Sequence, residues 1–194
     1  MSYRNWFRLL VVVPLLSLFA CTPESRNSLP DENRIAPDAR LLGQWRAEPD
    51  SDDFRIQVAQ RDPLEFSAVT SETVKTEKGT RIHIVEYRLR AFDIGGRTIL
   101  AIQELGQALT REPTWLFATY RIDGEDGAAL FLMDESRIRQ LILGGDLPGV
   151  IRDSETQLPE LLITATPSAL AELIRDTEPA RLFTARVGPF VRVQ

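Results

Sequence analysis

Two residue types that support catalysis and metal binding are nearly missing from this chain of 194 residues. It contains one cysteine, Cys21, and one histidine, His83. A single cysteine excludes a disulfide within the chain, and one imidazole is too few for the usual zinc sites, which combine several His and Cys ligands. The sequence also lacks G-x-S-x-G, the nucleophile motif of α/β-hydrolases. We therefore expect no enzyme activity, no catalytic residue, no metal and no cofactor.

Positive charge is scarce as well. The chain has 23 Lys and Arg against 28 Asp and Glu, and its formal net charge is −5 at pH 7. Residues 1–20 contain two arginines and no acidic residue, so the rest of the chain carries −7. Binding to nucleic acid requires clustered basic side chains, and no basic patch stands out along the sequence. We predict no nucleic-acid partner and no attraction to anionic lipid headgroups.

The longest apolar run is too short to cross a membrane. It extends from Leu9 to Ala20, twelve residues, whereas a spanning helix needs about 20. Arg4 and Arg8 precede it and Pro14 interrupts it. A positive segment followed by an apolar run of about 7–15 residues is typical of a signal peptide. We therefore assign residues 1–20 to an export signal.

The end of this run, Leu18-Phe19-Ala20-Cys21, resembles the lipobox of bacterial lipoproteins. The resemblance implies cleavage between Ala20 and Cys21, with diacylglycerol attached to the Cys21 thiol. Two or three acyl chains would hold the protein on a membrane, since each buried CH₂ contributes about 0.8 kcal/mol. Thr22 in the following position implies the outer membrane, facing the periplasm, in a Gram-negative host. The alternative is an ordinary secretory signal with a chance cysteine.

The remainder divides into a polar segment and one folded domain. Residues 22–40 are polar and contain three prolines, which predicts a flexible tether. From residue 41 onward, short apolar-alternating segments predict strands. These segments are residues 54–59, 65–70, 81–93, 98–105, 115–123, 128–133, 161–165, 182–187 and 190–193. Residues 41–194 are therefore expected to form a single β domain.

Two short helices interrupt the strands. The first is expected at residues 134–143, with Asp134 as N-cap and a stop at Gly144-Gly145. The second is expected at residues 167–175, with Thr166 as N-cap and Pro167 at the first helical position. The fold class is therefore mainly β, an antiparallel β-barrel or a strongly curved sheet with two short inserted helices.

A three-residue pattern opens the β domain. Gly43-Gln44-Trp45 resembles the G-x-W motif of lipocalins and related calycins. In that family the glycine permits close entry of the chain into the barrel, and the tryptophan closes one end. The resemblance covers residues 41–187 in outline. It implies that an arginine of the last strand, Arg186 or Arg192, stacks over Trp45. A solvated surface arginine is the alternative for each.

Aromatic residues on several predicted strands are candidates for a ligand pocket. We single out Tyr87, Trp115, Phe117 and Tyr120 as ligand-binding residues, and a packed core explains the same pattern equally well. His83 shares a predicted strand face with Tyr87. We interpret it as an ordinary strand histidine, with a ligand contact inside the barrel as the alternative.

Anchor, barrel and aromatic residues together predict a non-enzymatic function. The favoured hypothesis is a membrane-anchored envelope lipoprotein that binds a small apolar or amphipathic ligand. Such a site requires a cavity lined by apolar side chains. The alternative is a structural or assembly lipoprotein that docks on another envelope protein, which requires an exposed apolar patch instead.

Overall fold

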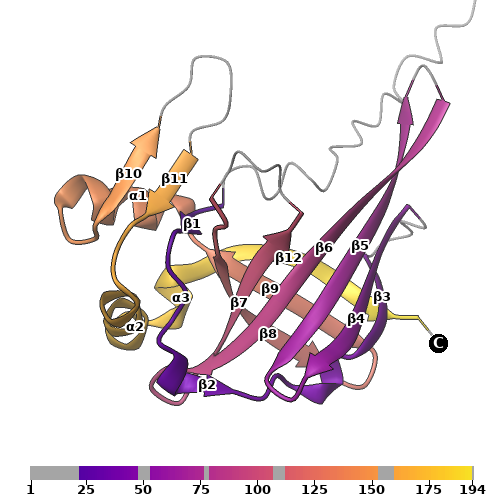
Figure 1. Cartoon of the computed structure of the whole chain (residues 1–194), viewed down its shortest axis with the longest axis horizontal. Coiled ribbons are helices and arrows are strands. Elements are labelled where there is room, and N and C mark those ends of the chain that lie inside the picture. Colours follow the sequence, from indigo (N-terminus) through magenta and orange to yellow (C-terminus); the bar gives the residue numbers. More distant parts are fainter. Residues whose placement is uncertain (1–21, 48–52, 77–78, 107–111, 153–159, 194) are drawn as a thin grey trace, which may run out of the picture.

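The centre of the molecule is a closed, eight-stranded antiparallel β-barrel, as the sequence predicts (Figure 1). The computed structural model describes residues 22–47, 53–76, 79–106, 112–152 and 160–193. The barrel strands are β3 (Gly43–Ala47), β4 (Phe54–Asp62), β5 (Glu65–Thr76), β6 (Gly79–Asp93), β7 (Thr98–Leu105), β8 (Leu116–Asp123), β9 (Gly127–Met133) and β12 (Phe183–Arg192). They pair in the order β6-β5-β4-β3-β12-β9-β8-β7, and β7 pairs again with β6 to close the ring.

The period-two alternation of each strand divides its side chains between two faces. On β4, Phe54 and Val58 are buried inside the barrel while Arg55 and Gln57 are exposed. On β7 both faces are apolar. Leu100 and Ile102 point inward, and Ile99 and Ala101 point outward into a second apolar cluster. Part of the barrel wall is therefore buried on both sides.

A second layer covers that part of the wall. It contains α1 (Glu135–Gly144), α2 (Pro167–Asp176), α3 (Pro179–Leu182) and a small sheet of β1 (Glu24–Ser25), β11 (Glu160–Ile163) and β10 (Gly149–Arg152). These elements lie to one side of the barrel in Figure 1. Their apolar side chains, including Ile138, Leu170 and Ile174, pack with Phe92 and Phe117 of the wall in what we call the outer core.

The two predicted helices begin at the predicted caps. The Asp134 side chain accepts a hydrogen bond from the backbone N of Arg137, and Thr166 accepts one from Ala169. Gly145 ends α1 with a φ of 79°, a conformation that glycine reaches without a steric clash. The four-residue helix α3 is not predicted. It follows directly on α2 and begins, like α2, with a proline.

The prediction of a flexible tether at residues 22–40 is wrong. This segment contains β1, β2 (Arg34–Ile35) and two 3₁₀ helices, Asp31–Asn33 and Ala39–Leu41. Its backbone is paired, because β1 lies parallel to β11 and β2 lies antiparallel to β6. Leu29 is only 2% exposed, within the outer core. Backbone pairing and a few apolar anchors therefore order a segment whose composition is polar.

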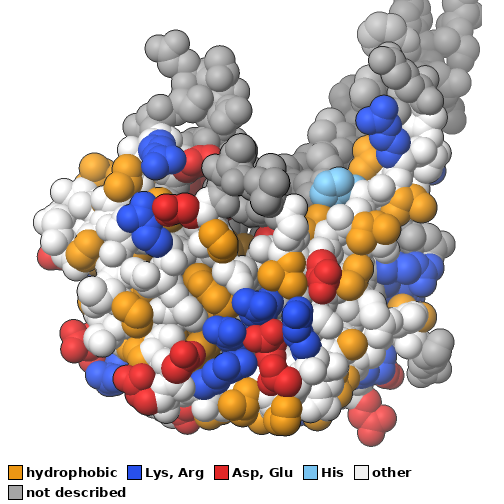
Figure 2. All heavy atoms as spheres, viewed as in Figure 1, with side chains coloured by type: hydrophobic (Ala, Val, Ile, Leu, Met, Phe, Trp, Pro, Cys, Tyr) orange, Lys and Arg blue, Asp and Glu red, His pale blue; other side chains and the backbone are white. Residues whose placement is uncertain are grey.

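The β5–β6 hairpin extends beyond the rest of the barrel. β7 pairs with β6 only from Glu86 to Asp93, so among the described strands the earlier residues of β6 pair with β5 alone. Ile82 and Ile84 there are 67% and 66% exposed. Figure 2 shows the hairpin projecting from the molecule, with His83 on its surface. Among the described helices, none is long and apolar enough to cross a membrane.

Candidate functional site

Trp45 closes the end of the barrel at which β3 begins, as the G-x-W resemblance implies. Its side chain is 3% exposed, and its indole N–H donates to the backbone oxygen of Leu41 over 2.9 Å. Leu41 is the last residue of the 3₁₀ helix Ala39–Leu41, which leads into β3. We call this end of the barrel the closed end.

Arg192 covers the outer side of Trp45. Its guanidinium carbon lies 4.3 Å from the centre of the indole ring, a cation–π contact that stabilises by about 0.5–2 kcal/mol. The same guanidinium donates to the backbone oxygens of Leu42 and Arg40 over 2.5 and 2.6 Å. The predicted arginine of the last strand is therefore Arg192. Arg186 is exposed and lies opposite Phe131 of β9.

Gly43 is required by this arrangement. Its φ is +117°, and a Cβ at this position would lie 2.7 Å from Nη1 of Arg192. Any other residue would meet both backbone strain and a clash with the guanidinium. The glycine of G-x-W therefore makes room for the arginine that covers the tryptophan.

Tyr120 lies near the same end. Its hydroxyl donates to Asp38 over 3.4 Å, and Asp38 forms an ion pair with Arg40 at 2.7 Å. The hydrogen bond from Arg40 lowers the pKa of Asp38. Burial raises the pKa of Tyr120 to about 12, and the charge of Asp38 acts in the same direction. Tyr120 is therefore neutral at physiological pH, and its hydroxyl links β8 to the segment preceding β3.

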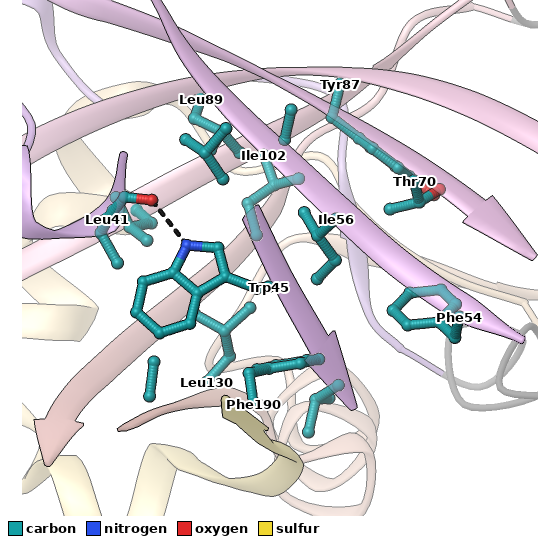
Figure 3. Close-up of a pocket in the computed structure, with 15 residues that line it drawn as sticks. Leu41, Trp45, Phe54, Ile56, Thr70, Tyr87, Leu89, Ile102, Leu130 and Phe190 are labelled. Atoms are coloured by element: carbon teal, nitrogen blue, oxygen red, sulfur yellow. Dashed lines mark hydrogen bonds between the residues drawn. The ribbon is translucent and has the colours of Figure 1, made fainter. Parts of the chain in front are cut away.

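A cavity of about 100 Å³ lies in the barrel interior beside Trp45 (Figure 3). Its walls come from β3, β4, β5, β6, β7, β9 and β12. The side chains that line it are Leu41, Trp45, Phe54, Ile56, Val58, Ala68, Thr70, Tyr87, Leu89, Leu100, Ile102, Ala128, Leu130, Val187 and Phe190. None of them is charged. These walls therefore match an apolar ligand group.

Two of the lining residues carry hydroxyl groups, although almost all of the surface that faces the cavity is apolar. Thr70 and Tyr87 lie together on β5 and β6, away from Trp45 (Figure 3). The Thr70 hydroxyl donates to the backbone oxygen of Val85 over 3.4 Å. Burial raises the pKa of Tyr87 to about 12, and the nearby charge of Glu104 adds to the effect. Tyr87 therefore stays protonated at physiological pH, and its hydroxyl is hydrogen-bonded with that of Thr70.

The volume limits what the cavity can hold. Pockets for drug-sized ligands measure about 300–1,000 Å³, whereas an apolar cavity of about 150 Å³ binds a benzene molecule. A space of about 100 Å³ matches a group slightly smaller than benzene, such as the end of an alkyl chain. The geometry suits insertion of one apolar end rather than enclosure of a whole ligand.

The four predicted ligand-binding residues lie in three different places. Tyr87 lines the cavity. Tyr120 packs inside the barrel toward the closed end, outside the set that lines the cavity. Trp115 and Phe117 belong to the outer core, where they are 7% and 0% exposed. Aromatic character alone does not separate these positions, because Phe117 faces the outer core whereas Tyr120 on the same strand faces the barrel interior.

Most of the residues that line the cavity are not among those predicted. Phe54, Ile56 and Val58 alternate along β4, and this alternation marks them as one face in the sequence. Leu130 comes from β9 and Phe190 from β12. These two strands pair with each other although they are far apart in the sequence. Strand alternation therefore identifies the inward set on each strand, and only the closed ring shows which members surround empty space.

His83 lies apart from the cavity. His83 is exposed on the projecting hairpin and does not line the cavity. In the part of the chain that the structure describes, no group of three or more His, Cys, Asp or Glu side chains is arranged to hold a metal ion. Ala20 and Cys21 are outside the described residues, so the lipid anchor stays a prediction.

Comparison with known proteins adds no relative. No protein-family model matches the sequence. No curated protein and no solved structure is similar enough to count as a match. Any assignment of function therefore rests on the sequence motifs and on the geometry described above.

Proposed function

We propose that the protein is an envelope lipoprotein whose barrel binds the apolar end of a small amphipathic or apolar ligand. The observation that carries this proposal is the uncharged cavity of about 100 Å³ between Trp45 and the Tyr87–Thr70 pair. An alkyl end inserted there would replace empty space with dispersion contacts. The Tyr87 hydroxyl would meet the more polar part of the ligand.

The location proposed for this binding module is the periplasmic face of the outer membrane. The lipobox resemblance at Leu18-Phe19-Ala20-Cys21 supports it. The described chain begins at Thr22 and is paired with the outer layer from Glu24 onward. An anchor on Cys21 would therefore hold the domain close to the bilayer, because only Thr22 and Pro23 separate Cys21 from a paired strand.

Ligand binding is tested with a variant that fills the cavity. Ala68 lines the cavity, and Ala59 is exposed on the neighbouring strand β4. Titration with a medium-chain fatty alcohol, followed by native mass spectrometry and Trp fluorescence, is expected to show one bound molecule. Ala68→Leu should weaken binding by at least about tenfold, since a leucine side chain occupies much of the space. Ala59→Leu, the matched control, should leave binding unchanged. Equal affinity in all three proteins would overturn the proposal.

The anchor is tested separately. Mass spectrometry of the native protein should show diacylglycerol on Cys21, and the protein should require detergent for release from membranes. Cys21→Ser should abolish both properties while leaving the barrel folded. A wild-type protein without acyl mass would overturn the proposed location but not the proposed ligand site.

A docking function on another envelope protein is the second candidate. The observation in its favour is the projecting hairpin, where Ile82 and Ile84 are 67% and 66% exposed. These two side chains are two residues apart on β6 and share one face of the strand, and leaving such apolar surface in water is unfavourable. A photo-crosslinker placed at Ile82 in intact cells should recover a protein partner under this hypothesis. Recovery of monomer alone would remove it.

A further inference from the structure

A cluster of arginines surrounds one carboxylate on the outer surface of the barrel. Glu65, the first residue of β5, has a side chain only 5% exposed. Its Oε1 accepts from Nε of Arg88 over 3.1 Å, and its Oε2 accepts from Nε of Arg90 over 3.0 Å. Arg34 and Arg61 complete the cluster, with nitrogens 3.4 and 3.5 Å from the carboxylate. Figure 2 shows basic side chains gathered around acidic ones on this face.

The strand register assembles this cluster. Glu65 lies directly opposite Arg90 across the β5–β6 pair. Arg88 is two residues earlier on β6, and side chains two apart share a face of the sheet. Arg34 comes from β2, which pairs with β6 next to these residues. The sequence shows no basic patch because its members are scattered from residue 34 to residue 90.

The charges of the cluster do not balance. Four guanidinium groups face one carboxylate, which leaves three positive charges in a chain whose net charge is −5. Glu65 is the acidic partner in every ion pair that the described residues give to these four arginines. Holding like charges this close raises their electrostatic energy unless an anion lies nearby.

The guanidinium groups are held in place, but not all of their N–H donors are hydrogen-bonded. Nη1 of Arg88 donates to the side-chain oxygen of Gln103 over 3.1 Å. Arg90 lies 5.3 Å from the ring centre of Trp115. The four arginine side chains are between 19% and 46% exposed. Each guanidinium has five N–H donors, so several donors remain for a ligand beside the hydrogen bonds to Glu65.

We propose that this arginine cluster is a binding site for a phosphate-bearing anion, separate from the barrel cavity. Arginine donates two parallel hydrogen bonds to a phosphate, and its geometry suits planar or tetrahedral oxyanions. The ion pairs with Glu65 keep the four arginine side chains in one region. All four side chains are partly exposed, so a phosphate group at this surface would contact at least two of them.

Titration of the full-length protein with inorganic phosphate tests the site, with sodium chloride at matched ionic strength as the reference. Phosphate should bind and raise the melting temperature, and chloride should not. Arg88→Gln should weaken phosphate binding by about tenfold, the effect of losing one charge-assisted contact. Arg121→Gln removes an arginine from an exposed ion pair with Asp123 on β8. This matched control should bind phosphate as the wild type does.

Glycerol phosphate distinguishes the two sources of such a group. It carries the phosphate of a lipid headgroup without acyl chains. If it binds at least tenfold more tightly than inorganic phosphate, the natural ligand is a headgroup-like phosphate ester. If the two affinities are equal, the phosphate group alone is recognised. Both results support the site, because both ligands should lose affinity in Arg88→Gln.

A Glu65→Gln variant tests whether the cluster is only a set of counter-ions for Glu65. In that case phosphate would bind this variant alone, in the place of the lost carboxylate charge. The proposal expects binding in the wild type as well. Binding restricted to Glu65→Gln would overturn it, as would equal effects of phosphate and chloride on the wild type.

Discussion

The inner and outer faces of the barrel wall bury similar side chains but pack them differently. On β8, Phe117 points outward and Ala118 points inward, and both are 0% exposed. The outer face meets α1, α2 and the small sheet, and most of its cluster is nearly inaccessible to solvent. The inner face meets mainly the other barrel strands, together with Leu41 at the closed end, and a cavity of about 100 Å³ remains among them.

The difference follows from how each core is built. Helices can move toward a sheet until their side chains interlock with its surface. A closed ring of eight strands has its radius set by strand number and stagger, so its interior is filled only by side chains. Ala68 and Ala128 are among those that line the cavity, and they are too small to reach its centre. Small residues inside a ring of fixed size therefore leave space, whereas the helices can approach Ala101, which is 0% exposed on the outer face.

Removing a large side chain from each face should produce unequal losses, and this is the largest effect that we expect. Phe117→Ala in the outer core should lower the free energy of unfolding by about 4 kcal/mol, because the phenyl ring is completely buried and its removal opens a large void. Phe54→Ala at the cavity should cost about half as much, since Phe54 already borders empty space. Urea unfolding of both variants measures the difference. Equal losses would mean that the two faces are packed alike.

Adding one methyl group at Gly43 should destabilise the closed end of the barrel. Gly43→Ala should destabilise the protein by about 3 kcal/mol, from backbone strain at a φ of +117° and from displacement of Arg192. In an Arg192→Ala background the same change should cost clearly less, because only the strain remains. A double-mutant cycle by chemical denaturation measures this coupling. Additive effects would show that Gly43 and Arg192 act independently.

The sequence predicts the barrel well because its information is local. The strand at residues 98–105 matches β7, and Asp134 and Thr166 cap the predicted helices. Alternation, turn glycines and N-caps all act within a few residues. The tether prediction fails for the same reason. Polar composition is a local signal, and pairing of β1 with β11 depends on contacts more than 130 residues away.

The candidate sites are harder to predict than the fold. Gly43 and Trp45 can be recognised because they form a contiguous motif, and their partner Arg192 follows from the resemblance. The cavity depends on the closed ring, which no local pattern contains. The arginine cluster joins strands through Glu65. Composition even argues against it, since the chain as a whole is acidic.

Adding volume to each face should sharpen the comparison further. Ala101→Leu in the outer core should destabilise by about 2 kcal/mol, because the added atoms force neighbouring side chains apart. Ala68→Leu points into the cavity and should change stability by less than about 1 kcal/mol. Thermal unfolding monitored by circular dichroism measures both variants. A strongly destabilising Ala68→Leu would show that the cavity cannot accept a group of this size.

The smallest effect concerns the protonation of Tyr87 at the cavity. Its pKa is raised from 10.0 to about 12, chiefly by burial. The pKa of Tyr87 in the folded protein lies above its value in the unfolded chain. The contribution of Tyr87 protonation to the free energy of unfolding is therefore complete below pH 10 and is lost as the pH rises toward 12. The absorbance of tyrosinate during an alkaline titration, compared between the wild type and Tyr87→Phe, isolates this group. Tyr120 also has its pKa raised to about 12, but it lies outside the cavity and serves as the internal control.

An alkyl ligand should raise the pKa of Tyr87 further, since it excludes water from the cavity, and should leave that of Tyr120 unchanged. An equal shift of both tyrosines would place the ligand elsewhere in the barrel.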